Sequence, residues 1–242
     1  MKWAVLSDIH GNLEAFKAVL DRLSKEDVDK VAFLGDVVGY GADPAKCTDL
    51  VNERTDITVA GNHDYGSVGL ADTSCFNTVA KAAIEWTREQ LSGDHLIFLS
   101  KLPLNSVEDD LHFVHSTPYN PQDWDYLFSW SDVIRGFHSF RNRICFIGHS
   151  HTPAIFIKDR EGRVYSSKDF SIRLEEGFQY IINVGSVGQP RDGNPDAAFG
   201  IYDINEMKFT LNRIPYDVET AQRKIIEAGL PRYLATRIGV GR

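Results

Sequence analysis

The sequence predicts an α+β protein, a four-layer α/β/β/α sandwich in which two mixed β-sheets pack face to face with helices outside. The first half of the chain alternates short, β-branched apolar runs with segments of helical periodicity. The second half consists mostly of strand-like runs separated by turn residues. A chain of 242 residues that is 43% hydrophobic is long enough to fill such a core. Because no repeat or Gly/Ser-rich linker divides it, we predict one domain over residues 1–242.

The first half begins with a βαβ pattern. Residues 3–6 and 31–34 are apolar runs, and between them Leu13, Phe16, Leu20 and Leu23 recur at helical spacing. Asp43-Pro44, a capping residue followed by proline, predicts the start of the next helix. Further elements are expected as a strand at 57–60, a helix from about 74 to 91, and a short helix from 93 that ends before Pro103.

The second half is expected to be mostly antiparallel sheet. A last helix is predicted at about 218–228. The predicted strands lie at 111–114, 144–147, 154–158, 163–165, 171–174, 180–184, 198–203 and 208–213.

Charge and composition exclude several classes of partner. The chain has 26 Lys and Arg against 34 Asp and Glu, a net charge of −8, so we expect no bulk nucleic-acid binding. No apolar run approaches the length of a membrane span, and Met1-Lys2-Trp3 leads directly into a strand, so we expect a cytoplasmic protein without membrane contact. Cys47, Cys75 and Cys145 follow no metal or disulfide spacing and are expected to be free thiols.

Polar side chains follow five of the predicted strands. In open α/β sheets ligands gather at the carboxyl ends of strands, so these residues can converge although they are distant in sequence. Taken singly, each is more typical of a turn or a cap. Together they are hard to bury without a metal, because buried polar groups need partners. The set contains three oxygen donors and four imidazoles: Asp8, Asp36, Asn62, His10, His115, His149 and His151.

Seven mixed ligands are too many for one tetrahedral ion and suit two ions that share a bridge. Such a pair lies about 3.5–4 Å apart, lowers the pKa of a bridging water and stabilises the in-line displacement of a phosphoester. Imidazole-rich ligation favours transition metals over Mg or Ca, so we expect two divalent ions drawn from Mn, Fe, Zn or Ni. Manganese is one of these alternatives.

The residues Asp8-x-His10, Gly35-Asp36, Gly61-Asn62-His63-Asp64, His115 and Gly148-His149-x-His151 resemble the five motifs of the calcineurin-like metallophosphoesterases. The stretch 183–191 looks like the small bacterial and archaeal branch called phosphodiesterase-like or diadenosine-tetraphosphatase-like. The resemblance implies a metallophosphoesterase domain in which a metal-bridging hydroxide attacks phosphorus. By motif position, Asp36 would bridge the ions; one would be held by Asp8, His10 and His151, and the other by Asn62, His115 and His149.

The same resemblance implies that His63 is a catalytic residue next to the substrate, as general acid or as stabiliser of transition-state charge. Asn62 and Arg191 would bind substrate with it. The chain departs from the family at the second motif, where Gly39-Tyr40 stands in place of Asp-Arg, so protein phosphatase activity is not expected. Asp64 could orient His63, and Arg191 could replace the missing phosphate grip; an ordinary surface arginine is the alternative at 191.

The expected function is hydrolysis of a small phosphodiester or phosphomonoester. One alternative is a non-catalytic metal-binding scaffold of the same fold, although neither His63 nor any of the seven ligands is missing here. The other is a nuclease, which would need a basic groove or a capping domain that this acidic chain does not show. The sequence indicates no oligomeric state.

Overall fold

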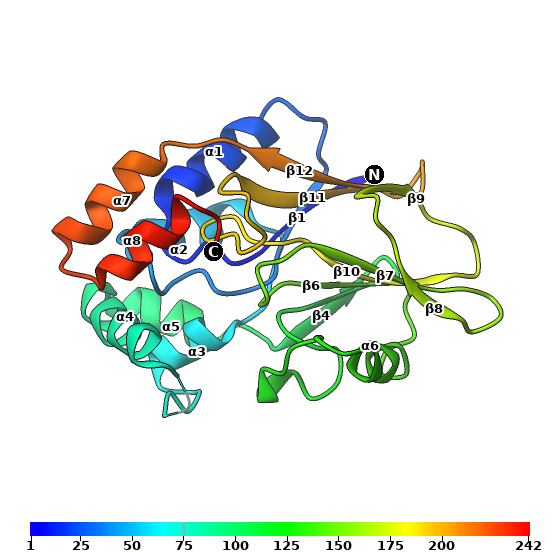
Figure 1. Ribbon diagram of the computed structural model, residues 1–242, viewed down its shortest axis with the longest axis horizontal. Coiled ribbons are helices and arrows are strands. Elements are labelled where there is room, and N and C mark those ends of the chain that lie inside the picture. Colours follow the sequence, from blue (N-terminus) through cyan, green and yellow to red (C-terminus); the bar gives the residue numbers. More distant parts are fainter. Residues whose placement is uncertain (75) are drawn as a thin grey trace.

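The structure, a computed structural model, describes residues 1–74 and 76–242 and places two six-stranded sheets face to face (Figure 1). The first sheet has β1 at its centre, paired in parallel with β2 and antiparallel with β11. In spatial order its strands are β3 (Ile57–Thr58), β2 (Lys30–Phe33), β1 (Lys2–Leu6), β11 (Ala197–Asp203), β12 (Lys208–Ile214) and β9 (Ser171–Arg173).

The second sheet is also mixed. Its strands β5, β6 and β10 run in parallel; β4 pairs antiparallel with β5, β7 pairs antiparallel with β10, and β8 pairs antiparallel with β7. Parallel neighbours end at the same edge of a sheet, so each sheet brings several strand ends together. In spatial order the strands are β4 (Asn105–Glu108), β5 (Leu111–Val114), β6 (Ile144–Ile147), β10 (Gln179–Asn183), β7 (Ala154–Lys158) and β8 (Val164–Ser166).

Helices cover the outer faces. In Figure 1, α1 lies over the first sheet and α6 under the second, while α7 and α8 lie beyond α1 at the end of the molecule that also holds α3, α4 and α5. The helices are α1 (Leu13–Leu23), α2 (Pro44–Arg54), α3 (Asn62–Val68), α4 (Thr78–Gln90), α5 (Gly93–Ser100), α6 (Trp130–Phe137), α7 (Val218–Glu227) and α8 (Arg232–Ile238). A single 3₁₀ turn covers Pro121–Asp123.

The layers follow from the alternation of side chains along buried strands. In β1, Trp3 and Val5 point into the core between the sheets, whereas Ala4 and Leu6 pack in the core beneath α1 and α2. In the second sheet, Phe146 faces the first sheet and Cys145 packs with residues of α6. Strands that are apolar on both faces therefore produce the predicted four-layer sandwich.

Most of the expected elements are confirmed, and the differences have local causes. The strand β4 was missed because only one of its four residues is apolar and it lies at a sheet edge. The helix expected at about 74–91 begins at Thr78, where the Asn77 side chain caps it. The helix expected at about 218–228 is confirmed as α7, but the expectation that it is the last helix was wrong, since α8 follows it. Helices α3, α6 and α8 have only 7, 8 and 7 residues, too few for a clear period.

Two of the three cysteines, Cys47 and Cys145, are buried free thiols as expected. Cys75 lies outside the described residues. Within 1–74 and 76–242, every helix is too short or too polar to cross a bilayer.

The core between the sheets predicts the effect of a truncation. Phe146 is fully buried there and stacks on Phe113, with ring centroids 5.8 Å apart. Phe146→Ala should lower the free energy of unfolding by about 3–5 kcal/mol, because it removes apolar contacts and leaves a cavity. Denaturant unfolding measures this, with Tyr165→Ala on exposed strand β8 as the control. Equal stability of the two variants would contradict the assigned core.

Candidate metal centre

The predicted ligands converge where the strands of the two sheets end. Asp8 and His10 follow β1, Asp36 follows β2, His115 follows β5, and His149 and His151 follow β6. All six side chains are buried. They form two groups that share Asp36, and within each group the ligand atoms lie within 4.8 Å of one another: Asp8, His10, Asp36 and His151, and Asp36, His115 and His149.

Asp36 stands between the two groups. Its Oδ2 lies 3.5 Å from His10 Nε2 and 3.4 Å from His115 Nε2. Its Oδ1 accepts a hydrogen bond of 2.8 Å from the backbone N–H of His63. The carboxylate therefore faces both groups at once, which is the geometry that a bridging ligand needs.

The remaining contacts close each group. Asp8 Oδ1 lies 3.3 Å from His151 Nε2 and 3.7 Å from His10 Nε2. In the second group, His115 Nε2 lies 3.1 Å from His149 Nδ1. Asn62, the first residue of α3, is buried beside them, and its Oδ1 has no hydrogen-bond partner in the described part of the chain.

Backbone carbonyls fix the imidazole rings from behind. Nδ1 of His10, His115 and His151 lies 3.1, 2.7 and 2.6 Å from the carbonyls of Val38, Leu34 and Gln189, so each ring turns its Nε2 into the site. His149 is reversed, because its Nε2 lies 2.9 Å from the Trp124 carbonyl and its Nδ1 faces the site. In the neutral form, which a metal ligand must have, one nitrogen of each ring is thus left as a lone-pair donor.

This arrangement fits a cation. With the Nδ1 protons of His10 and His151 donated to carbonyls, their Nε2 lone pairs face each other at 3.0 Å with no proton between them. Burial lowers the pKa of both rings, so both are neutral near pH 7. Asp8 Oδ1 and Asn62 Oδ1 are buried acceptors without donors among the described residues. Divalent ions would satisfy all of these groups, and the nitrogen and oxygen donors suit transition metals.

The charges of the site are strongly coupled. Burial alone would raise the pKa of Asp36, but His115, His63 and His10 hold that pKa well below its usual range. Burial lowers the pKa of His115, yet Asp36 and Asp8 overcome it and raise the value to about 9. The carboxylates of Asp36 and Asp8, both with a lowered pKa, are therefore ionised at neutral pH, as metal ligands must be.

The backbone is strained at the ligands. Asp8, His10, Asp36, His149 and His151 have φ between 50° and 64°, the left-handed region that side chains other than glycine rarely adopt. Such strain costs on the order of 1 kcal/mol per residue and clusters at functional sites. The loops close tightly as well: a Cβ at Gly148 would collide with Ser7 Oγ and would lie 2.6 Å from Asp8 Oδ2. Glycine at residue 148 therefore allows the close approach of Ser7 and Asp8 to the end of β6.

His63 lies beside the ligands but outside both groups. Its ring centroid is 4.4 Å from Tyr40, 4.9 Å from His10 and 5.2 Å from Phe76. Burial, with Arg191 and the neighbouring imidazoles acting against Asp36, lowers its pKa to about 4. A Cβ at residue 39 would collide with His63 Nδ1, so Gly39 leaves the space that this ring occupies.

Asp64 does not orient His63 in this structure. Its carboxylate accepts hydrogen bonds from the backbone N–H groups of Asp36, Val37, Val38 and Gly61, at 2.7 to 3.3 Å. His63 Nδ1 has no hydrogen-bond partner within the described chain. Asp64 therefore holds the loop that carries Asp36, and we correct the orienting role suggested by its position in the sequence. The aromatic rings of Tyr40 and Phe76 hold His63 instead.

Arg191 belongs to the site. It lines a cavity of about 240 Å³ together with Asp36, Asn62, His63 and Tyr40. Its guanidinium lies 5.9 Å from the Tyr40 ring centroid and donates to Gln189 Oε1 at 2.9 Å, while its Nε has no partner among the described residues. Arg191 therefore lies at the wall of the cavity beside the candidate ligands.

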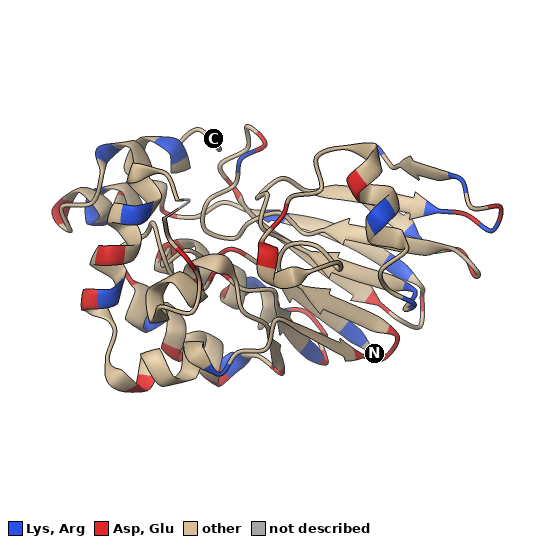
Figure 2. Cartoon of the chain, turned by 90° about the horizontal axis from the view of Figure 1, so that it is seen from below, with Lys and Arg blue, Asp and Glu red and all other residues tan. Residues whose placement is uncertain are grey.

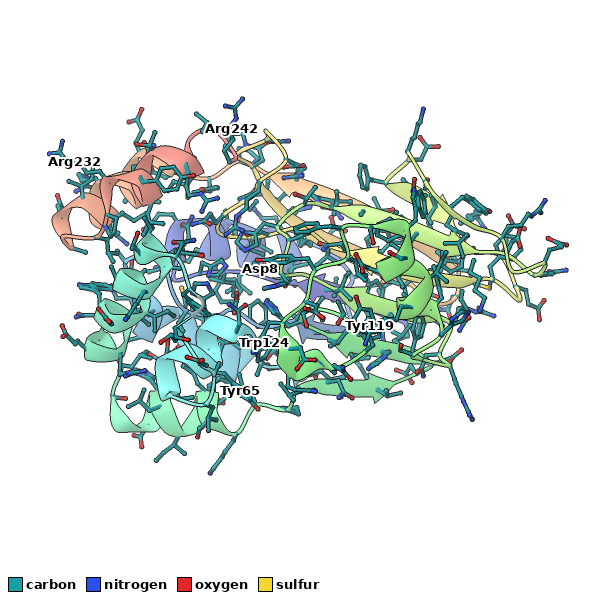
Figure 3. All side chains as sticks on the ribbon, turned by 60° about the horizontal axis from the view of Figure 1, so that its bottom comes forward. Asp8, Tyr65, Tyr119, Trp124, Arg232 and Arg242 are labelled. Atoms are coloured by element: carbon teal, nitrogen blue, oxygen red, sulfur yellow. The ribbon has the colours of Figure 1, made fainter. Side chains whose placement is uncertain are left out.

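The sequence analysis missed the segment after His115. Trp124, whose carbonyl holds His149, has φ of 56° and packs edge-on against Tyr65 with ring centroids 5.8 Å apart (Figure 3). Tyr126 stacks on His149 with centroids 4.0 Å apart. The three aromatic residues in 124–128 were the available sign, but a backbone carbonyl contact leaves no pattern in sequence.

Two face-to-face sheets with buried carboxylates and imidazoles at their joined ends define a metallophosphoesterase fold and site. The family model for the calcineurin-like phosphoesterase superfamily domain matches residues 1–207. The chain belongs to this superfamily, which confirms the resemblance drawn from the motifs.

Relatives match almost the whole chain. The uncharacterized protein MJ0912 of Methanocaldococcus jannaschii is 39% identical over 244 residues, covering 99% of this chain and 98% of that protein. A metallophosphoesterase from Sphaerobacter thermophilus has a TM-score of 0.88 at 36% identity over 100% of this chain and 99% of its own. The hypothetical protein PH1004 of Pyrococcus horikoshii has a TM-score of 0.79, 18% identity and coverage of 100% and 98%, and shows the fold alone.

The buried imidazoles predict how the metal-free protein responds to acid. Burial lowers the pKa of His63 to about 4 and of His149 to about 3, and it also lowers those of His10 and His151. Between pH 6.5 and about 4 the unfolded chain protonates these rings and the native state does not. Burial and Asp36 raise the pKa of Asp64 to about 7, so this carboxyl is protonated in the native state over this range. It releases one proton on unfolding, which opposes the uptake by the imidazoles. Unfolding therefore takes up protons on balance, so the free energy of unfolding decreases as the pH is lowered.

Each net proton corresponds to about 1.4 kcal/mol per pH unit. Denaturant unfolding in chelator between pH 6.5 and 4.5 should show the decline. His115 adds no slope there, because with a native pKa of about 9 it is protonated in both states. The stability that His115 contributes is lost as the pH rises from 6.5 to about 9. Stability that stays flat or rises on acidification would contradict the buried neutral imidazoles.

Proposed function

We propose that this chain hydrolyses a small phosphodiester or phosphomonoester with two divalent transition-metal ions. The observation that carries the proposal is Asp36, whose carboxylate is shared by two buried ligand groups while His63 stands beside them outside both. Manganese, iron, zinc and nickel all suit the donor set. We further propose that residues 1–242 act as one domain, since Tyr40 packs with residues of α7 and α8, outside the matched family segment.

The ligands divide as the groups suggest. Asp8, His10 and His151 would hold one ion, and Asn62, His115 and His149 the other, with Asp36 between them. When bound, the ion pair supplies an activated water as nucleophile and neutralises charge on the phosphoryl oxygens. The carbonyls behind the imidazoles keep the lone pairs directed into the site before any ion arrives, which reduces the cost of binding.

Arg191 and Asn62 position the phosphate. Arg191 lines the same cavity as His63, and its buried Nε–H has no partner among the described residues, so the guanidinium can donate to a phosphoryl oxygen. The backbone of residue 191 is held by its N–H, which donates to the His151 carbonyl at 3.1 Å. This hydrogen bond restricts movement of Arg191 relative to the metal ligands.

His63 serves the leaving group. In the free protein its pKa is about 4, because burial and the neighbouring cationic Arg191 disfavour the imidazolium. A bound phosphate anion adjacent to the ring reverses this balance and raises the pKa, so that His63 can carry a proton when the substrate is present. The ring then donates that proton to the departing oxygen.

The reaction is balanced without further reactants. Water attacks phosphorus, the bond from phosphorus to the leaving oxygen breaks, and one ester R–O–PO₂⁻–O–R′ with one water yields the monoester R–O–PO₃H⁻ and the alcohol R′–OH. The alcohol receives its proton through His63, and the proton released by water returns to solvent or to the ring.

Two other functions receive less support. A non-catalytic scaffold does not need His63 in an aromatic pocket or a free Arg191 Nε in the same cavity. A nuclease needs a basic groove, whereas in the view of Figure 2 Lys and Arg alternate with Asp and Glu over helices and strand ends. Absence of bulk nucleic-acid binding and a cytoplasmic location stay predictions from the sequence.

Metal stoichiometry tests the shared site. Purified protein saturated with Mn or Zn and then freed of excess metal should contain two ions per chain by elemental analysis. Asp36→Asn should lose tight binding of both, because the bridge contributes to each group. Control variant Asp49→Asn alters an exposed carboxylate that lies 2.9 Å from His95 Nε2, outside both ligand groups, and should keep both ions. One ion per chain at saturation would contradict the proposal.

His63→Ala tests catalysis separately from metal binding. Donation of a proton by a positioned side chain is commonly worth about 10²- to 10⁴-fold in rate, so kcat should fall by that factor while metal content stays unchanged. The loss should be smaller with p-nitrophenolate as leaving group than with an alkyl alcohol, which needs the proton more.

Three results separate the roles. Equal losses with both leaving groups would mean that His63 acts on the phosphoryl oxygens. Unchanged activity, or metal that falls in parallel with rate, would contradict the assigned role.

A further inference from the structure

The loop between β10 and β11 carries Arg191 into the cavity beside the metal ligands. The Arg191 guanidinium donates to Gln189 Oε1 at 2.9 Å and lies 5.9 Å from the Tyr40 ring centroid, while its Nε has no partner among the described residues. Gln189 belongs to the same loop. The direction of the arginine side chain therefore depends on where the backbone of this loop lies.

The first half of the loop is fixed by the loops that carry metal ligands. Residues 181–190 are all buried. The N–H of Gly188 donates to the Asp8 carbonyl at 2.9 Å, and the N–H of Arg191 donates to the His151 carbonyl at 3.1 Å. This half of the loop is thereby tied to the candidate ligands on both sides.

The second half of the loop is exposed and is held by a different part of the chain. Arg213 on β12 forms an ion pair with Asp192, the residue after Arg191. The N–H of Gly193 donates to the Gly241 carbonyl at 2.8 Å. Both contacts come from residues beyond 207, where the match to the family model ends.

The backbone at Gly241 is suited to this contact. Its φ is 64°, and a Cβ there would lie 2.6 Å from the carbonyl carbon of Asn194. Figure 1 shows the end marked C beside the loop that leads into β11. The preceding helix α8 is anchored in the protein, because Ile238 is buried in the same apolar cluster as Tyr40. Gly241 therefore connects the Arg191 loop to a fixed support.

We propose that Gly241 and Arg213 are positioning residues for Arg191. The inference rests on the proposed function and adds the part of the chain that sets the phosphate-binding arginine. The two contacts hold the exposed half of the loop next to Arg191, and so fix the direction in which the guanidinium enters the cavity. Displacement of a positioned group by an ångström can cost about 100-fold in rate, so a loose loop would impair the reaction without disturbing the metal ligands.

Two glycines with similar backbone strain test the proposal. Gly241→Ala adds a methyl group against Asn194, whereas the Cβ added by Gly229→Ala, at φ of 73°, meets no atom within 4 Å. Both substitutions force alanine into the left-handed region, so a difference between them reports the contact with the loop. Gly241→Ala should lower kcat/KM for a p-nitrophenyl ester by about 3- to 100-fold relative to Gly229→Ala, with metal content unchanged.

A double-mutant cycle separates positioning from a general structural role. Arg191→Gln should lower kcat/KM by about 10- to 100-fold, because it removes a charged hydrogen-bond donor. In that background Gly241→Ala should cause no further loss, since its effect acts through Arg191. Arg213→Gln, which leaves the glycine in place, should behave in the same way and provides the test if Gly241→Ala fails to fold.

Three results would overturn the proposal. They are a loss that is as large in the Arg191→Gln background as in the wild type, equal kcat/KM for Gly241→Ala and Gly229→Ala, and metal content that falls in parallel with kcat/KM.

A binding measurement gives a readout that does not depend on turnover. Calorimetric titration of the metal-loaded protein with inorganic phosphate should show weaker binding by Gly241→Ala than by Gly229→Ala, and the difference should vanish when each is combined with Arg191→Gln. If no ester is hydrolysed, the proposed function fails. The titration then decides the positioning role alone: phosphate that binds both glycine variants equally tightly overturns it.

Discussion

The Asp36 carboxylate is the contact on which the rest of the site depends. One oxygen faces His10 and His115, which belong to different ligand groups, and the other accepts the backbone N–H of His63. The loop behind it is held by Asp64, which takes the N–H groups of residues 36, 37 and 38. The imidazoles around Asp36 lower the pKa of its carboxyl, and the Asp36 carboxylate raises the pKa of His115. These charged groups are therefore held close together by loops with a strained backbone, as the positive φ of Asp8, Asp36 and His149 shows.

His149 connects this centre to the outer wall of the site. The three other imidazoles are anchored through Nδ1 by carbonyls of loops that follow strands, whereas His149 is anchored through Nε2 by Trp124. Trp124 has a left-handed backbone, and Tyr126, two residues further on, covers the face of the same imidazole. Residues 124–126 are thus tied to His149 by both a hydrogen bond and a ring stack, so the position of this imidazole and the conformation of the segment are coupled.

Much of the fold could be predicted from the sequence because buried strands leave clear apolar runs. The runs at 111–114, 144–147 and 154–158 match the observed strands, and the predicted ligands after the first two converge because β5 and β6 are parallel and end at one edge. What failed was local geometry. Asp64 was expected to orient His63, but its carboxylate turns to the backbone of the Asp36 loop, and no periodicity or spacing records that choice. The anchoring of His149 by Trp124 was missed for the same reason, since a carbonyl is present at every residue.

The departure from the family at Gly39-Tyr40 is understandable in these terms. Where the family pattern has an Asp-Arg pair, a glycine leaves room for the His63 ring and a tyrosine packs against it with centroids 4.4 Å apart. The positive charge comes from Arg191, which is distant in sequence and whose guanidinium lies 5.9 Å from the same tyrosine ring. Packing thus takes over the positioning of the imidazole, and the glycine-rich loop after β10 supplies the cation. Because Arg191 also lowers the pKa of His63, the charges of the two residues are coupled, and an anion bound between them would favour the charged form of both.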